Sequence, residues 1–246
     1  MVWEFFERRR SGVFVDVGAN HPTEHNQTWF LELQGWTGVL LEANPVLAKL
    51  LREQRPPSRT FQVAAVGPGQ SGLVDLHLAV GHGQSSLQPD LGVALTGETF
   101  RVRAQMLDSI MEEAGLSGID FLSLDVEGVE LEVLRGLDLK RYQPRLILIE
   151  DHVHNYQKHR FLRAHGYRLV RRTGYNNWYV PNTDPATILR LCNARETWNL
   201  LRKMWVSSPF IRAKRVLKKA RCKRTPKQVS NSVLSCSNEN PPTCPT

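Results

Sequence analysis

The stretch FLSLDVEGVELEVLRG, residues 121–136, decides how this chain folds. It begins with a short apolar run that is typical of a buried strand, and it continues with apolar residues at helical spacing until a glycine ends the helix. A strand followed at once by a helix is the repeating unit of a parallel sheet. Three carboxylates fall within six positions, where the strand ends: Asp125, Glu127 and Glu130.

The same alternation of strand and helix extends over residues 12–181. Apolar and β-branched runs predict strands within 12–18, 37–45, 60–69, 73–80, 118–128 and 144–152, and helical spacing predicts helices within 23–35, 46–57 and 129–137. The segment 166–181 holds two strands around the turn TGYNN without room for a crossover helix, so this pair must be antiparallel. The pattern predicts an α/β fold with a doubly wound, mostly parallel sheet and an antiparallel last strand.

Positive charge is concentrated at the C-terminal end of the chain. The formal net charge is +8, and residues 201–246 hold eleven Lys and Arg against one acid, Glu239, a charge of +10 that leaves −2 for residues 1–200. Residues 207–224 can form a basic amphipathic helix, and the Ser-, Asn- and Pro-rich residues after Thr225 have the composition of disorder. We therefore expect one folded domain over residues 1–200, and a basic helix with a disordered tail over residues 201–246.

The basic region has three interpretations. It can be a solvated terminal helix, it can contact an anionic membrane surface or an acidic partner, or it can bind RNA. The missing interleaved aromatic residues make nucleic acid the weakest of the three. The sequence leaves the oligomeric state open.

Several features predict a cytoplasmic protein. No run reaches the roughly 18 to 20 apolar residues that a membrane helix needs, and the N-terminus becomes charged too early for a signal peptide. The four cysteines, which lack a CxxC pair and a histidine at zinc-ligand spacing, are expected to be free thiols.

Polar residues follow four of the predicted strands. Ligands of parallel sheets bind at the carboxyl ends of the strands, so we expect these residues to share one edge. They are Asp16, Gly18 and Asn20 at the end of the strand within 12–18, Glu42 and Asn44 at the end of the one within 37–45, Asp125, Glu127 and Glu130 at the end of the one within 118–128, and Glu150, Asp151 and His152 at the end of the one within 144–152.

The first two strand ends predict a site for S-adenosylmethionine. Gly18 lets a ligand approach the backbone closely, and the carboxylate of Asp16 suits the cationic amino acid end of such a ligand. Glu42 has the position and acceptor capacity to bind both hydroxyls of a ribose, and Asn20 and Asn44 complete the two loops. A dinucleotide would require a G-x-G-x-x-G loop, and this loop holds one glycine.

Four blocks of the sequence, FVDVGANHP, GWTGVLLEANP, LDSIMEEAG and IDFLSLDVEGVELEVLRGL, resemble in order and spacing the FkbM family of S-adenosylmethionine-dependent methyltransferases. The resemblance covers about residues 12–181. It implies a class I methyltransferase (Rossmann-like) fold, with a seven-stranded sheet whose last strand is antiparallel, and methyl transfer to an oxygen, often on a sugar, a glycan or a secondary metabolite. Pro22 stands where the family often has glycine, which predicts a stiffer loop after Asn20.

The carboxylates at the end of the strand predicted within 118–128 have two interpretations. Asp125 or Glu127 can cap the following helix. Alternatively, Asp125, assisted by Glu127, orients the acceptor hydroxyl, removes its proton or holds a divalent cation, whereas Glu130 faces solvent one turn later. The end of the strand predicted within 144–152 adds His152 as a candidate base, and Glu150 with Asp125 as candidate ligands of Mg²⁺.

Two other functions share the predicted sheet. A nicotinamide-dependent dehydrogenase is disfavoured by the missing glycine fingerprint and by the antiparallel last pair. A non-catalytic binding module that kept the fold would be expected to lose the acids at the strand ends, and Asp16, Glu42 and Asp125 are all present.

Overall fold

The computed structural model describes residues 1–79, 87, 95–151, 156–192 and 194–206 of the chain. The chain divides into two compact units, Met1–Ser208 and Pro209–Thr246. The second unit lies outside the described residues, and with it the predicted basic helix and disordered tail.

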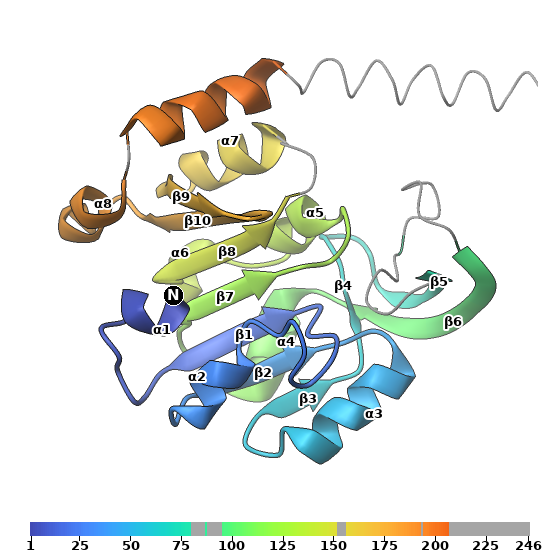
Figure 1. Ribbon diagram of the computed structural model, residues 1–246. Helices are drawn as coiled ribbons and strands as arrows, with labels where there is room; N and C mark the ends of the chain where they lie inside the picture. The colour runs from blue at the N-terminus through green and yellow to red at the C-terminus, as the bar shows by residue number, and fades with distance from the viewer. Residues whose placement is uncertain (80–86, 88–94, 152–155, 193, 207–246) are drawn as a thin grey trace, which may run out of the picture. The chain divides into compact units, whose positions relative to one another are not determined.

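A seven-stranded sheet forms the centre of the first unit (Figure 1). From edge to edge its strands are β3 (Arg59–Phe61), β2 (Thr37–Leu41), β1 (Val13–Val17), β7 (Phe121–Leu124), β8 (Leu146–Glu150), β10 (Asn176–Pro181) and β9 (Tyr167–Thr173). β1 pairs in parallel with β2 and β7, whereas β10 pairs antiparallel with β8 and β9. The predicted doubly wound sheet with an antiparallel last strand is confirmed. Strand order reverses between β1 and β7, which places the expected ligand site at their carboxyl ends.

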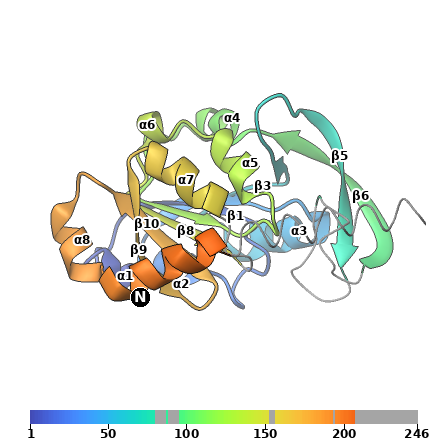
Figure 2. The same cartoon turned by 90° about the horizontal axis from the view of Figure 1, so that it is seen from above.

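Helices cover both faces of this sheet (Figure 2). One face packs against α4 (Leu107–Ala114), α5 (Glu130–Arg135), α6 (Leu139–Tyr142) and α7 (Tyr156–Ala164), and the other against α1 (Val2–Phe5), α2 (Trp29–Leu33), α3 (Pro45–Gln54) and α8 (Pro185–Leu191). The alternation of side chains along β1 supplies both cores, because Val15 and Val17 point to the first face and Phe14 to the second.

A second, three-stranded sheet has the order β4 (Ala64–Ala65), β6 (Leu95–Gln105) and β5 (Gly72–Ala79). β5 pairs antiparallel with β6, and Ala64, Leu76 and Val102 form its small core. The sequence predicted one strand within residues 60–69. The structure divides this segment between the two sheets, because the strand pairing breaks at residues 62–63 and lets β4 leave the main sheet.

A further helix, residues 194–206, completes the core of the first unit. It lies beside α7 (Figures 1 and 2), and its Leu200 and Met204 belong to the same buried cluster as Leu162 of α7. Residues four apart lie on one face of a helix, so this face packs on the domain. The predicted domain boundary after Leu200 therefore falls inside a helix, and the compact unit continues to Ser208.

This packing predicts different outcomes for two truncated chains. A chain that ends at Ser208 should keep the stability of the full chain, whereas one that ends at Leu200 should lose about 2 to 5 kcal/mol, because it lacks the fully buried side chain of Met204. Urea unfolding of both chains measures the difference. Equal unfolding free energies would show that residues 201–208 are not part of the domain.

Candidate functional site

The backbones that follow β1 and β7 lie in direct contact. The N–H of Asp125 donates to the carbonyl of Val17 over 2.9 Å, and the N–H of Gly18 donates to the carbonyl of Leu41 over 2.9 Å. Gly18 has a φ of +82°, and a Cβ atom at this position would lie 1.9 Å from the carbonyl oxygen of Asp125. Glycine is therefore required here by packing between the two strand ends, in addition to any approach by a ligand.

A cleft of about 610 Å³, including its open mouth, lies at the ends of these strands. Five of the residues predicted from sequence line it: Gly18, Asn20, Glu42, Asp125 and Glu127. Apolar side chains form much of the remaining wall, among them Leu47, Val63, Leu76 and Leu87. The structure thus brings three of the predicted cofactor residues and two of the predicted catalytic residues into one cleft.

Glu42 connects the loops after β1 and β2. It is 8% exposed, and its two carboxylate oxygens accept the backbone N–H groups of Asn20 and Asn44, each over 2.8 Å. Burial raises the pKa of Glu42, and these two hydrogen bonds act in the opposite direction. A carboxylate oxygen has two lone pairs, so each oxygen of Glu42 keeps the capacity to accept a ligand hydroxyl.

Asp16 and Asn44 have structural contacts and do not line the cleft. The neighbouring side chain of Val17 lines the cleft, and the alternation along a strand directs Asp16 to the opposite face. Asp16 is 3% exposed and accepts the hydroxyl of Thr28 over 2.8 Å, and burial raises its pKa. Asn44 caps α3, since its Oδ1 accepts the N–H of Val46 over 2.9 Å. The predicted contact between Asp16 and a ligand amino group is therefore not supported by this geometry.

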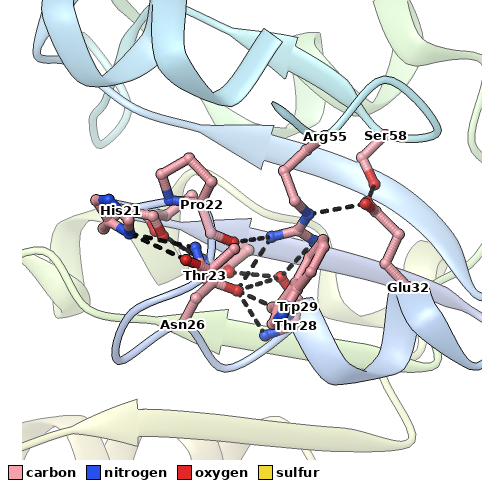
Figure 3. A network of polar contacts seen from close by, with 11 residues as sticks. His21, Pro22, Thr23, Asn26, Thr28, Trp29, Glu32, Arg55 and Ser58 are labelled. Carbon is pink, nitrogen blue, oxygen red and sulfur yellow. Dashed lines mark hydrogen bonds and ion pairs between the residues drawn. The ribbon is translucent and has the colours of Figure 1, made fainter. Parts of the chain in front are cut away.

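A buried arginine holds the loop between β1 and α2 (Figure 3). The side chain of Arg55 is 0% exposed, and its guanidinium donates to Glu32 Oε1, Asn26 Oδ1, Thr28 Oγ1 and the carbonyl of Pro22, over 2.9 to 3.2 Å. The hydroxyl of Thr28 in turn donates to the carboxylate of Asp16, so Asp16 belongs to the same network.

The same network explains why α2 is short. Sequence spacing predicted a helix over residues 23–35, but Asn26 Oδ1 accepts the N–H groups of Thr28 and Trp29, so the helix begins only at Trp29. Sequence analysis missed Arg55, because an arginine beside two prolines at the end of a helix carries no sign of burial.

Three carboxylates gather at the ends of β7 and β8. Asp125, Glu127 and Glu150 each offer an oxygen within 4.8 Å of the others. Burial, followed by the hydrogen bond and negative charge of Glu150 and the charge of Glu127, raises the pKa of Asp125 to about 9. At neutral pH this group therefore favours a bound proton or a nearby positive charge over a free carboxylate.

Neither Asp125 nor Glu127 caps the helix that follows. Helix α5 begins at Glu130 after Val129, which makes no side-chain cap, and Glu127 adopts a φ of +49°. Glu130, expected in solvent, is instead 4% exposed, and its Oε1 accepts the N–H of Gly128 over 2.8 Å. The turn Asp125–Gly128 thus directs carboxylates toward the cleft because its backbone is left-handed at residues 127 and 128.

Lys158 is a second buried cation that sequence analysis missed. Its Nζ lies 2.9 Å from Glu130 and 3.2 Å from Asp151, and it donates to the carbonyl of Glu150 over 3.5 Å. It lies on α7, and these contacts connect it to the end of β8. In the sequence, the only indication of such a buried cation was the number of acids at the carboxyl ends of the strands. His152, predicted as a base, lies outside the described residues.

Comparison with known proteins identifies the family. A model of the methyltransferase FkbM domain matches residues 16–169. The chain belongs to the FkbM methyltransferase family. The matched FkbM region contains the Glu42 loops and the Asp125 turn, and this membership favours methyl transfer over the dehydrogenase alternative.

Two solved structures are similar to the chain. A methyltransferase FkbM from Methylobacillus flagellatus KT is 15% identical with a TM-score of 0.47, over 70% of this chain and 44% of that one. A precorrin-6y C5,15-methyltransferase from Geobacter metallireducens GS-15 is 13% identical with a TM-score of 0.38, over 72% and 82%. The match thus spans less than half of the first of these proteins. No curated protein matches the chain.

Two glycine substitutions test the contact between the strand ends. Gly18→Ala and Gly69→Ala both place a Cβ on a left-handed backbone, with φ of +82° and +79°, which costs about 1 to 2 kcal/mol. Only Gly18→Ala also forces the carbonyl of Asp125 to move, because no atom lies within 4 Å of a Cβ at Gly69. Urea unfolding should show a loss at Gly18 that is larger by roughly 2 kcal/mol or more. Equal losses would contradict the close packing.

Proposed function

We propose that the chain is an S-adenosylmethionine-dependent O-methyltransferase that acts on a hydroxyl of a sugar, a glycan or another small polar metabolite. The observation that carries this proposal is that Glu42 and the pair Asp125 and Glu127 line the same cleft. One rim has acceptors suited to a ribose, and the other has carboxylates suited to a hydroxyl that loses a proton.

The residues of the cleft fit this cofactor. Glu42 would accept the ribose hydroxyls, since both of its oxygens are fixed by backbone N–H groups and keep free lone pairs. Leu76 and Leu87 are among the apolar side chains available to the adenine ring, and Gly18 leaves the backbone accessible. S-adenosylmethionine supplies a methyl group on a positively charged sulfur. Asp16 contributes indirectly, because it holds Thr28 and thereby the loop after β1.

The carboxylate cluster would prepare the acceptor. A hydroxyl must be aligned with the methyl carbon and must lose its proton as the new carbon–oxygen bond forms. Asp125 would accept that proton in its ionised form, which the positive charge of the bound cofactor would favour, and its raised pKa makes this carboxylate a stronger base than that of an ordinary aspartate. Glu127 and Glu150 would orient the hydroxyl and keep negative charge beside it.

The same cluster fits Mg²⁺. All three donors are carboxylate oxygens, which this cation prefers, and they lie within 4.8 Å of one another. Asp125, Glu127 and Glu150 would hold the ion, and a bound cation would lower the pKa of the acceptor hydroxyl. The arrangement is therefore compatible with either a metal-assisted or a carboxylate-only site.

The cofactor contact predicts a specific loss of affinity. Glu42→Gln replaces one acceptor oxygen by a donor, so binding of S-adenosylmethionine should weaken by about 1.5 to 3 kcal/mol in calorimetry. Glu53→Gln, an exposed acid on α3, is the matched control and should bind normally. A Glu42→Gln chain that stays folded and binds with unchanged affinity would remove Glu42 from the site.

The acceptor chemistry predicts a loss of turnover without loss of the cofactor. Asp125→Asn should keep cofactor affinity while turnover falls by about 10² to 10⁴, and the exposed Asp75→Asn should change neither. Turnover is measured by incubation with labelled cofactor and a cell extract, where label should appear on glycans or small metabolites. Label on protein or RNA would overturn the substrate class.

A chelator distinguishes the metal-assisted site from the carboxylate-only site. The metal would be established if the chelator abolishes activity, if Mg²⁺ restores it, and if calorimetry shows Mg²⁺ binding that Asp125→Asn abolishes.

A further inference from the structure

The helix of residues 194–206 exposes two tryptophans. The side chains of Trp198 and Trp205 are 68% and 67% exposed. They are seven residues apart, almost two full turns, so they lie on the same face, with the exposed Arg202 between them. Val206, 52% exposed, extends this surface. We call these four residues the tryptophan face.

The tryptophan face is separate from the face that builds the core. Leu200 and Met204, on the other side of the same helix, are 7% and 0% exposed. The helix is thus already anchored to the domain, and its tryptophans are not needed for that packing. Single exposed apolar residues are ordinary on a protein surface, but large apolar side chains grouped on one face mark an interaction site.

The chemistry of this face suits the boundary between lipid and water. A tryptophan ring is apolar while its N–H remains a hydrogen-bond donor, and this combination is enriched at membrane interfaces. Arg195, Arg202 and Lys203 are exposed on the same helix. Long basic side chains can lay their apolar stems on the lipid while the charge stays at the headgroups.

The charge of the adjoining sequence favours an anionic lipid over a protein partner. Residues 209–227 hold nine Lys and Arg and no acid, and Phe210, Ile211, Val216 and Leu217 are placed among them. These residues lie outside the described part of the chain. An apolar anchor next to a polybasic segment is the two-signal combination that holds proteins on anionic membranes. The first 200 residues, with a net charge of −2, would not add to this attraction.

We propose that the tryptophan face docks on an anionic lipid surface, with the rings of Trp198 and Trp205 at the headgroup level and Arg202 on the lipid phosphates. The contact is peripheral. Residues 194–206 span roughly 20 Å, less than the hydrocarbon core of a bilayer. Across the described ranges of the chain, no helix combines the length and apolarity needed to cross a membrane.

Vesicle sedimentation of the full chain tests this proposal. The wild type should bind vesicles that contain about 30% phosphatidylserine in phosphatidylcholine, and should stay in solution with phosphatidylcholine alone. The double variant W198A/W205A should partition at least about tenfold less. The matched control L33A/L189A removes two exposed leucines from α2 and α8, which are 59% and 83% exposed, and should bind like the wild type. Thermal melting verifies that both variants are folded.

Two further measurements use the wild type alone. Brominated phospholipids should quench part of its tryptophan fluorescence, and binding should fall as salt rises from roughly 0.05 to 0.5 M.

Wild-type-like binding by W198A/W205A would overturn the proposal, as would a wild type that does not bind anionic vesicles. A different result would identify a second copy of the chain as the partner: a wild type that forms a concentration-dependent dimer and does not bind vesicles, and a W198A/W205A variant that stays monomeric.

Discussion

The close backbone contact between Gly18 and Asp125 is the constraint on which the site depends. It occurs where β1 and β7 are neighbours and the strand order reverses, so the loops after both strands must share one small space. Any side chain at residue 18 would push them apart. Because the loops stay together, Glu42, which lies one strand away from β1, and Asp125 line the same cleft. In the proposed function, this backbone packing would set the distance between cofactor and acceptor.

Two buried cations show how the domain holds this cleft in place. Arg55 is fully buried, but its donors meet a carboxylate, a hydroxyl, an amide and a carbonyl, so the cost of removing its charge from water is offset within the network. Lys158 lies between Glu130 and Asp151 and steadies the end of β8. Neither cation is among the residues that line the cleft. The carboxylates in the cleft are different, since the pKa of Asp125 is raised to about 9, which is unfavourable for stability but useful for a group that must take up a proton or a cation.

The helix of residues 194–206 links the fold to the proposed membrane contact. One face completes the hydrophobic core through Leu200 and Met204, and the other presents Trp198 and Trp205 outward. Attachment of the helix to α7 means that a surface bound by the tryptophans would be held at a fixed position relative to the domain. A methyltransferase held in this way would meet acceptors that are themselves enriched at that surface.

The sequence by itself determined the α/β class, the antiparallel last pair of strands, and the gathering of Gly18, Asn20, Glu42, Asp125 and Glu127. These features follow from local periodicity and from the rule that parallel strands carry their ligands at the carboxyl ends, neither of which requires knowledge of distant contacts. The tertiary structure decided what depends on residues far apart in the chain. It turned Asp16 toward Thr28, buried Glu130 against Lys158, and surrounded Arg55 with partners from another loop. It also joined residues 201–206 to the domain, because only packing on α7 distinguishes a core helix from the basic segment that follows. Burial and charge pairing are properties of the assembled fold, so the identity of a charged residue in the sequence does not show whether its side chain contacts water or a buried partner.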